Sequence, residues 1–152
     1  MSDMVVDADA FGRTIEQLLG RLETNLETFL PETVERTLAV GEQAWRDNAN
    51  GQFSGTYVIG GFGDPKYGKV VTIGKYAKSI RHRMMKRGGH EFEGEIGSPS
   101  LPGLPHLLEK GHARVGGGYV AGRKHIEPAA DSAFDRFEEF LDEAIEGAIF
   151  SV

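Results

Sequence analysis

The sequence predicts one α+β domain with two N-terminal helices, a small antiparallel β-sheet with a long β-arm or loop, and a C-terminal amphipathic helix packed on the sheet. Apolar residues recur at helical spacing near both ends of the chain, whereas short β-branched runs separated by glycine fill its middle. The 152 residues suit a single domain. Its expected parts are a helical part at 1–49, an extended arm or loop at 50–68, sheet and loops at 69–126, and a final helix at 127–150.

The first helical part divides at a proline. Between residues 8 and 29, apolar residues follow three- and four-residue steps, which predicts an amphipathic helix with Asp7 or Asp9 as its N-cap. Pro31 disfavours helical geometry at Leu30 and is well placed to open a second helix that ends near Asn48. The pattern leaves open whether the two helices form a kinked rod or a tight corner.

Residues 48–68 combine six glycines with aromatic and β-branched side chains, which indicates a long β-arm with Gly63-Asp64-Pro65 near its tip. A mobile surface loop is the alternative. An arm of this kind cannot bury its apolar side chains alone, so we expect it to pack on the domain or on a neighbouring subunit. The arm residues expected at a subunit contact are Phe53, Tyr57, Phe62 and Tyr67.

The predicted sheet spans residues 69–97, with a turn at Gly74–Ser79 and a hairpin after it. A three-residue hairpin loop at 87–89 pairs apolar residues on one face and opposite charges on the other. That register pairs Ile80 with Ile96, Met84 with Phe92, Arg81 with Glu95 and Arg83 with Glu93.

Leu104–Ala129 connects the sheet to the last helix. It predicts a short helical turn that stops at Gly111, a glycine-rich loop at Ala113–Gly122, and a helix with Pro128 in its first turn. Because Glu109, Arg123 and His125 flank the loop, we expect charge-assisted hydrogen bonds to hold its two ends together. The loop, with Arg114, Tyr119 and nearby Lys124, is then a candidate docking surface.

Composition excludes several classes of protein. Without cysteine, the chain has neither disulfides nor thiolate metal ligands. No apolar run approaches the roughly 18 residues of a membrane span, and the first residues lack the basic and apolar regions of a secretory signal. We therefore expect synthesis in the cytosol and no membrane partner.

Charge is distributed in three blocks along the chain. Residues 1–59 carry 4 basic and 10 acidic side chains, residues 60–126 carry 12 and 5, and residues 127–152 carry 1 and 8. A basic middle between acidic ends suits contacts between copies, although acidic helices beside a basic sheet within one chain explain the same pattern.

The candidate catalytic patterns in the sequence do not match the spacing of known metal-binding, phosphate-binding or nucleophile motifs. His106, Glu109 and His112 form H-x-x-E-x-x-H, and His125 could add a ligand, but Gly111 interrupts the helix that would align them. The glycine runs at 60–63 and 116–118 lack the G-K-[ST] of a phosphate loop, and no serine lies in a G-x-S-x-G motif. The sequence predicts no enzyme, no cofactor and no metal site.

The basic run Lys78–Arg87 suggests an alternative function, that of a small nucleic-acid-associated or regulatory domain. No known reader motif surrounds the run, and the acidic chain as a whole repels a duplex. Non-specific proximity to DNA passing through a channel is a weaker requirement and stays open.

Three short motifs between about residues 70 and 145 resemble those of a known family. Thr72–Ile80 precedes a β-segment, Leu104–His112 precedes the glycine-rich loop, and Gly122–Ala129 opens the last helix. In this order they resemble the small tail-component or neck proteins that long-tailed bacteriophages and prophages encode among their head–tail joining genes. Tyr76, Pro105-His106 and Lys124 depart from the usual leucine, tyrosine–alanine and proline. The motif residues are Gly74, Ser79, Ile80, Leu108, Glu109, Gly111, His112, Arg123, His125, Pro128 and Ala129.

The resemblance implies a non-enzymatic virion protein that is assembled in the host cytoplasm and lies in the neck or tail. It implies a homo-oligomeric ring, six-fold rather than twelve-fold, that acts as a neck, stopper, tail-completion or terminator ring. The implied partners are a head–tail connector or stopper on one side and tail-tube or terminator proteins on the other. The docking loop would face the lumen or a partner ring.

Overall fold

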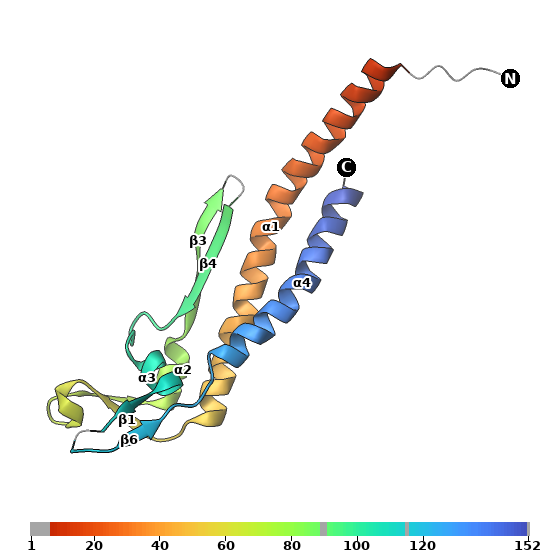
Figure 1. Cartoon of the computed structure of the whole chain (residues 1–152). Coiled ribbons are helices and arrows are strands. Elements are labelled where there is room, and N and C mark those ends of the chain that lie inside the picture. The colour runs from red at the N-terminus through yellow and green to blue at the C-terminus, as the bar shows by residue number, and fades with distance from the viewer. Residues whose placement is uncertain (1–6, 89–90, 115, 152) are drawn as a thin grey trace.

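The computed structural model describes residues 7–88, 91–114 and 116–151 and has the predicted α+β class (Figure 1). None of its helices, within these ranges, is long and apolar enough to cross a membrane. The elements are α1 (Ala8–Gln52), β1 (Thr56–Ile59), the 3-10 turn η1 (Gly61–Gly63), β2 (Lys69–Thr72), α2 (Ile73–Ser79), β3 (Arg81–Gly88), β4 (Glu91–Gly97), α3 (Leu104–Lys110), β5 (Gly111–Ala113), β6 (Tyr119–Ala121) and α4 (Glu127–Phe150).

The prediction of two N-terminal helices is wrong, because α1 is a single helix of 45 residues that contains Pro31. Its N-cap is Asp7, whose carboxylate accepts hydrogen bonds from the backbone N–H groups of Asp9 and Ala10. A proline inside a helix removes one hydrogen bond and costs about 3 kcal/mol. Here α4 contacts α1 on both sides of the proline, through Asn25 and Thr33, so tertiary packing holds the helix continuous.

The C-terminal helix forms over the predicted range but packs along α1 rather than on a sheet, which corrects the predicted architecture (Figure 1). The two helices are antiparallel, and α4 presents small residues and one aromatic ring to α1. The Arg36 side chain of α1 lies 3.9 Å from the centre of the Phe140 ring and forms a 2.7 Å ion pair with Glu143. The buried residues of α4 are Ala129, Ala133, Phe140, Ala144 and Ala148.

Instead of one sheet, the strands form three separate antiparallel hairpins, β1–β2, β3–β4 and β5–β6. The arm is one of these hairpins, because β1 pairs with β2 from Thr56 opposite Thr72 to Ile59 opposite Lys69. The expected turn at Gly74–Ser79 is the short helix α2, whose first turn is capped by the Thr72 hydroxyl. The β3–β4 hairpin lies along α1 on another face of the helix.

The β3–β4 hairpin forms, but the predicted register is wrong by two residues near its base. Arg83 pairs with Glu95 rather than Glu93, and a bulge follows between Met84 and Lys86. Residues 87 and 88 belong to β3, and Gly89 of the predicted loop lies outside the described residues. Because a shift of two residues preserves the faces of a strand, His82 and Ile96 still point toward α1 and the charged residues away from it.

The main core lies at the C-terminal end of α1, where α2, α3 and the start of α4 meet it. The rest of α1, most of α4 and the hairpins project from this body (Figure 1). The core residues are Trp45, Ala49, Val71, Ile73, Tyr76, Ala77, Ile80, Leu101, Leu104, Leu108 and Ala129.

Gly41 lies where α1, β4 and α4 meet, and it provides the first test of this packing. A Cβ at Gly41 would lie 2.5 Å from the Ile96 side chain and 3.3 Å from Ala133, so Gly41→Val should reduce the free energy of unfolding by about 1–3 kcal/mol. Gly20→Val is the matched control, because nothing lies within 4 Å of that position. Urea unfolding measures both, and equal stabilities would contradict the three-element contact.

Candidate functional site

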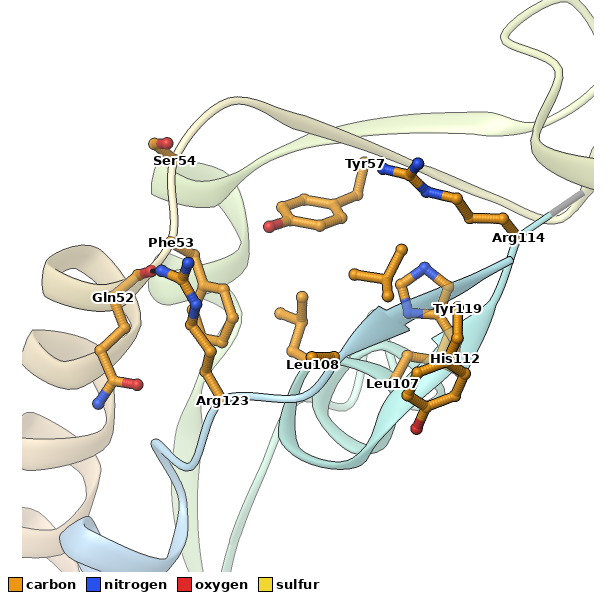
Figure 2. A pocket seen from close by; sticks show the side chains of 12 residues that line it. Gln52, Phe53, Ser54, Tyr57, Leu107, Leu108, His112, Arg114, Tyr119 and Arg123 are labelled. Atoms are coloured by element: carbon orange, nitrogen blue, oxygen red, sulfur yellow. Dashed lines mark hydrogen bonds between the residues drawn. The ribbon is translucent and has the colours of Figure 1, made fainter. Parts of the chain in front are cut away.

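A cleft of about 410 Å³ opens where the end of α1, strand β1, helix α3 and the β5–β6 hairpin meet (Figure 2). It brings together residues that lie in four separate parts of the sequence. The lining residues are Gln52, Phe53, Ser54, Tyr57, Leu107, Leu108, His112, Arg114, Tyr119, Val120, Ala121 and Arg123.

The cleft combines an apolar interior with cationic ends. Phe53, Tyr57 and Leu108 contribute apolar surface, and the side chains of Arg123 and Arg114 lie at opposite ends in Figure 2. None of the lining residues that the structure describes is acidic. A cleft with this composition suits a ligand or partner segment that carries both apolar groups and a negative charge.

Its basic groups retain hydrogen-bonding capacity. Arg123 donates to the Gln52 carbonyl oxygen at 2.8 Å, and no carboxylate among the described residues forms an ion pair with Arg123 or Arg114. Nδ1 of His112 is buried and has no hydrogen-bond partner in the described part of the chain. Because an unpaired buried polar atom is costly, a partner group that reaches His112 would gain a hydrogen bond.

Gly111 makes the geometry of the β5–β6 hairpin possible. Its φ of 86° ends α3, and a side chain there would collide with the Val120 carbonyl and the Tyr119 hydroxyl. The chain turns directly into β5, which pairs with β6 from Gly111 opposite Ala121 to Ala113 opposite Tyr119. The Tyr119 hydroxyl donates to the Lys110 carbonyl at 2.7 Å and fixes the base of the hairpin.

Glu109 joins α3 to the start of α4. Its carboxylate accepts the backbone N–H groups of His125, Ile126 and Glu127 at 2.7, 2.9 and 3.2 Å, and so caps a helix whose own N-cap residue has no capping side chain. Burial disfavours the charged carboxylate, but the three N–H donors outweigh burial and lower the pKa of Glu109. The two ends of the β5–β6 segment are therefore held together.

His125 is fully buried beside this cap. The Trp45 indole N–H donates to the Tyr76 hydroxyl at 3.0 Å, which leaves the hydroxyl proton to donate to Nε2 of His125 at 2.9 Å. The imidazole proton then lies on Nδ1, which is 2.8 Å from the Glu109 carboxylate. Burial lowers the pKa of His125 despite that carboxylate, and burial raises the pKa of Tyr76. These contacts join α1, α2, α3 and the start of α4 in one hydrogen-bonded network.

The structure separates the predicted site residues into three groups. Phe53, Tyr57, Leu108, His112, Arg114, Tyr119 and Arg123 line the cleft. Ile80, His125 and Ala129 are buried, so they shape the fold of this chain rather than meet a partner. Phe62 and Tyr67 are exposed on the arm. Four further residues, in α2 and at or just before the start of α4, do not line the cleft: Gly74, Ser79, Lys124 and Pro128.

Sequence patterns missed two groups of residues. Gln52, Ser54, Leu107, Val120 and Ala121 line the cleft without carrying a motif signal. Trp45 and Tyr76 form the His125 network, and their only signal is that each combines an apolar ring with a hydrogen-bonding group.

Two cations of the basic run 78–87 form ion pairs within the chain. Arg83 and Lys86 form ion pairs with Glu95 and Glu91. His82 contacts Glu42 through its backbone N–H at 2.8 Å and through its ring, and its Nε2 lies 3.0 Å from Glu35. Burial opposes the charged imidazole, but the hydrogen bonds to the two carboxylates outweigh it and raise the pKa of His82. No group of three potential metal ligands converges in the described residues.

Comparison with protein-family models, with curated proteins and with solved structures finds no match to this chain.

The Glu109 cap can be tested by Glu109→Gln, with Glu127→Gln as the matched control near the same helix end. An amide group directs its N–H₂ toward backbone donors, so Glu109→Gln should lower the free energy of unfolding by about 1.5–3 kcal/mol. Glu127 forms an exposed ion pair with Lys124, which solvent screens, so Glu127→Gln should change the free energy of unfolding little. Chemical denaturation measures the difference, and similar losses for both variants would contradict the cap.

The contacts of His82 with Glu35 and Glu42 predict that the contribution of His82 to stability falls as the pH rises, the opposite of ordinary acid denaturation. A raised folded-state pKa stabilises the protein fully below the unfolded value of about 6.5, and the contribution is lost as the pH rises through the folded value. The stability difference between the wild-type protein and His82→Gln should therefore shrink as the pH rises from acid to neutral and above. His106→Gln, on an exposed residue, is the control. A stability difference that grows with pH would contradict the stabilising role of these His82 contacts.

Proposed function

We propose that this protein is a virion structural protein of the bacteriophage head–tail interface, where it joins the DNA-filled head to the tail. The observation that carries the proposal is the set of large apolar side chains that remain exposed on separate projections of one small chain. They lie on the first turns of α1, on the β1–β2 arm and near the end of α4: Phe11 and Leu19, Phe62 and Tyr67, and Phe150. Proteins that assemble with copies and with other subunits carry such surfaces.

The arm is the feature best suited to reach a neighbour. Its base is held by Phe53 and Tyr57, which pack against the core, whereas Phe62 is 91% exposed and Tyr67 is 71% exposed. A β-hairpin with an anchored base and an exposed aromatic tip can insert between subunits without unfolding the body. We assign it to contacts within a homo-oligomeric ring of six subunits.

The basic cleft is the second proposed contact. It lies at the end of the molecule opposite the α1 N-terminus, together with Arg114, Tyr119 and Arg123 of the predicted docking loop (Figures 1 and 2). The exposed face of α4 carries Asp131, Asp135, Glu138 and Glu139. In a head-to-tail ring, a basic end of one subunit can meet an acidic helix of the next, and the same charges can recruit a connector, stopper, tail-tube or terminator protein.

The nucleic-acid alternative has less support, because the cations of Arg83 and Lys86 already form ion pairs within the chain. DNA that passes through the lumen of a ring requires no sequence-specific DNA-binding motif, so non-specific proximity to DNA is part of the head–tail proposal. Neither a catalytic role nor a cofactor is proposed.

The proposal is tested by inactivating the gene in the phage or prophage that encodes it and imaging the particles by negative-stain electron microscopy. The expected result is DNA-filled heads separated from complete tails, with joining restored by the wild-type gene. Normal joined particles, or a defect confined to empty heads or missing tail tubes, would overturn the assignment.

A charge reversal in the basic cleft tests the proposed contact more specifically. Arg114→Glu should reduce the yield of joined particles by at least about ten-fold, because it reverses an unpaired charge at the proposed contact. Lys75→Glu is the control, since it makes the same charge change on exposed residue 75 of α2. Equal infectivity of the two variants in complementation would contradict a role for the cleft.

A further inference from the structure

The N-terminal part of α1 projects beyond α4 and carries an uncovered apolar stripe (Figure 1). Residues 11–20 are all exposed, although the segment includes four large apolar side chains. Their exposed fractions are 60% for Phe11, 38% for Ile15, 41% for Leu18 and 60% for Leu19. A segment of about three helical turns is marginal in water unless its apolar face packs against another surface.

This stripe continues the surface on which α4 already lies. Positions 11, 15, 18, 22, 25 and 29 alternate steps of four and three residues, the spacing of a coiled-coil seam. Further along α1, Asn25 donates to the Ala148 carbonyl, and Phe29 lies 3.4 Å from the position of a Cβ on Gly147. Because α4 ends at Phe150, the same seam is left without a partner before Leu22.

We propose that this seam is covered by the same segment of a second copy of the chain, in an antiparallel helix pair with two-fold symmetry. A helix is the expected occupant because the covered half of the same seam binds a helix, α4. A second copy supplies a seam of matching period and length, and its own stripe is exposed in the same way.

The position of α4 determines the direction of the pair. In a parallel pair, both copies would continue past residue 25 side by side, and both α4 helices would have to occupy the space between them. In an antiparallel pair, each α1 N-terminus comes to the end of the other copy's α4, and the two bodies lie at opposite ends of the pair. Only the second arrangement keeps the seam closed along its whole length.

Charge favours the same direction. An antiparallel overlap centred near Ile15 places Arg21 of one copy level with Asp9 of the other, while Glu23 comes level with Asp7. A parallel overlap places Asp9 beside Asp9 and Arg21 beside Arg21. Opposite charges beside an apolar seam select the partner orientation in paired helices.

The inference goes beyond the proposed function and does not depend on it. The seam lies at the α1 N-terminus, and the basic cleft lies at the other end of the helix (Figure 1). A two-fold contact of this kind is also distinct from the head-to-tail contacts that close a ring, so the two proposals succeed or fail separately.

Light scattering after size exclusion tests the pairing through Leu18→Asp and the matched control Gln17→Asp. The wild-type protein and Gln17→Asp should have the same mass, whereas Leu18→Asp should reduce the mass by about a factor of two, because it places a charge in the seam. Circular dichroism and the melting temperature show whether the body still folds: Leu18→Asp should keep a cooperative melting transition, and any loss of helical signal should be limited to the unpaired N-terminal part of α1. A monomeric wild-type protein, or an unchanged mass for Leu18→Asp, overturns the pairing.

Cysteine crosslinking tests the direction, and the absence of native cysteine makes each introduced thiol unique. Ile15→Cys places equivalent thiols near the proposed two-fold axis, so a short bis-maleimide should link two chains efficiently. Arg13→Cys lies on the opposite side of α1 and should remain unlinked.

Because equivalent residues also meet in a parallel pair, a third variant, Arg21→Cys, distinguishes the two directions. Its thiols are far apart in the antiparallel pair and adjacent in the parallel one. Linkage through Arg21→Cys, or none through Ile15→Cys, overturns the proposal.

Discussion

The Glu109 carboxylate is the interaction on which the rest of the structure depends. It lies in the last turn of α3 and accepts three backbone N–H groups at the point where α4 begins. Beside it, His125 connects through Tyr76 to Trp45 of α1, and Asn48 donates to the His125 carbonyl. The direction in which α4 leaves the body is therefore fixed at its first residues by polar contacts with α1, α2 and α3. A buried network of this kind specifies one arrangement because each member loses a partner if another moves.

The fold was partly predictable because local signals agreed with the final packing. The capping of α1 near Asp7, the stop at Gly111 and the start of α4 at Pro128 each depend on residues within a few positions. Pro31 misled the interpretation because its local preference is outweighed by contacts with α4, which is more than 100 residues away in sequence. The β3–β4 register failed for a related reason: its bulge has no distinctive residue, and two registers that differ by two residues place the same faces inward.

The sequence predicted several residues of the candidate site but not the cleft that they form. Arg114, Tyr119 and Arg123 could be grouped because they flank one glycine-rich loop, but the other side of the cleft comes from Phe53 and Tyr57, which a sequence pattern assigns to a separate arm. His125 looked like a surface motif residue, since nothing in its neighbours shows that Trp45 and Tyr76 will enclose it. Burial of polar residues depends on long-range contacts, and such contacts leave no periodic signal.

The same helix explains why the two ends of the chain differ in character. Because α1 extends further than α4 can cover, its N-terminal seam stays exposed, while its C-terminal end is enclosed by the core and by the hairpins that form the basic cleft. One end is thus apolar and periodic, which suits another helix, and the other end is cationic and concave, which suits a carboxylate-bearing partner. The rigid pairing of α1 with α4 keeps a fixed distance between them, so a partner at either end is held in a defined position relative to the other. We therefore expect partners to meet the chain at these two ends, with the helix pair between them as the spacer.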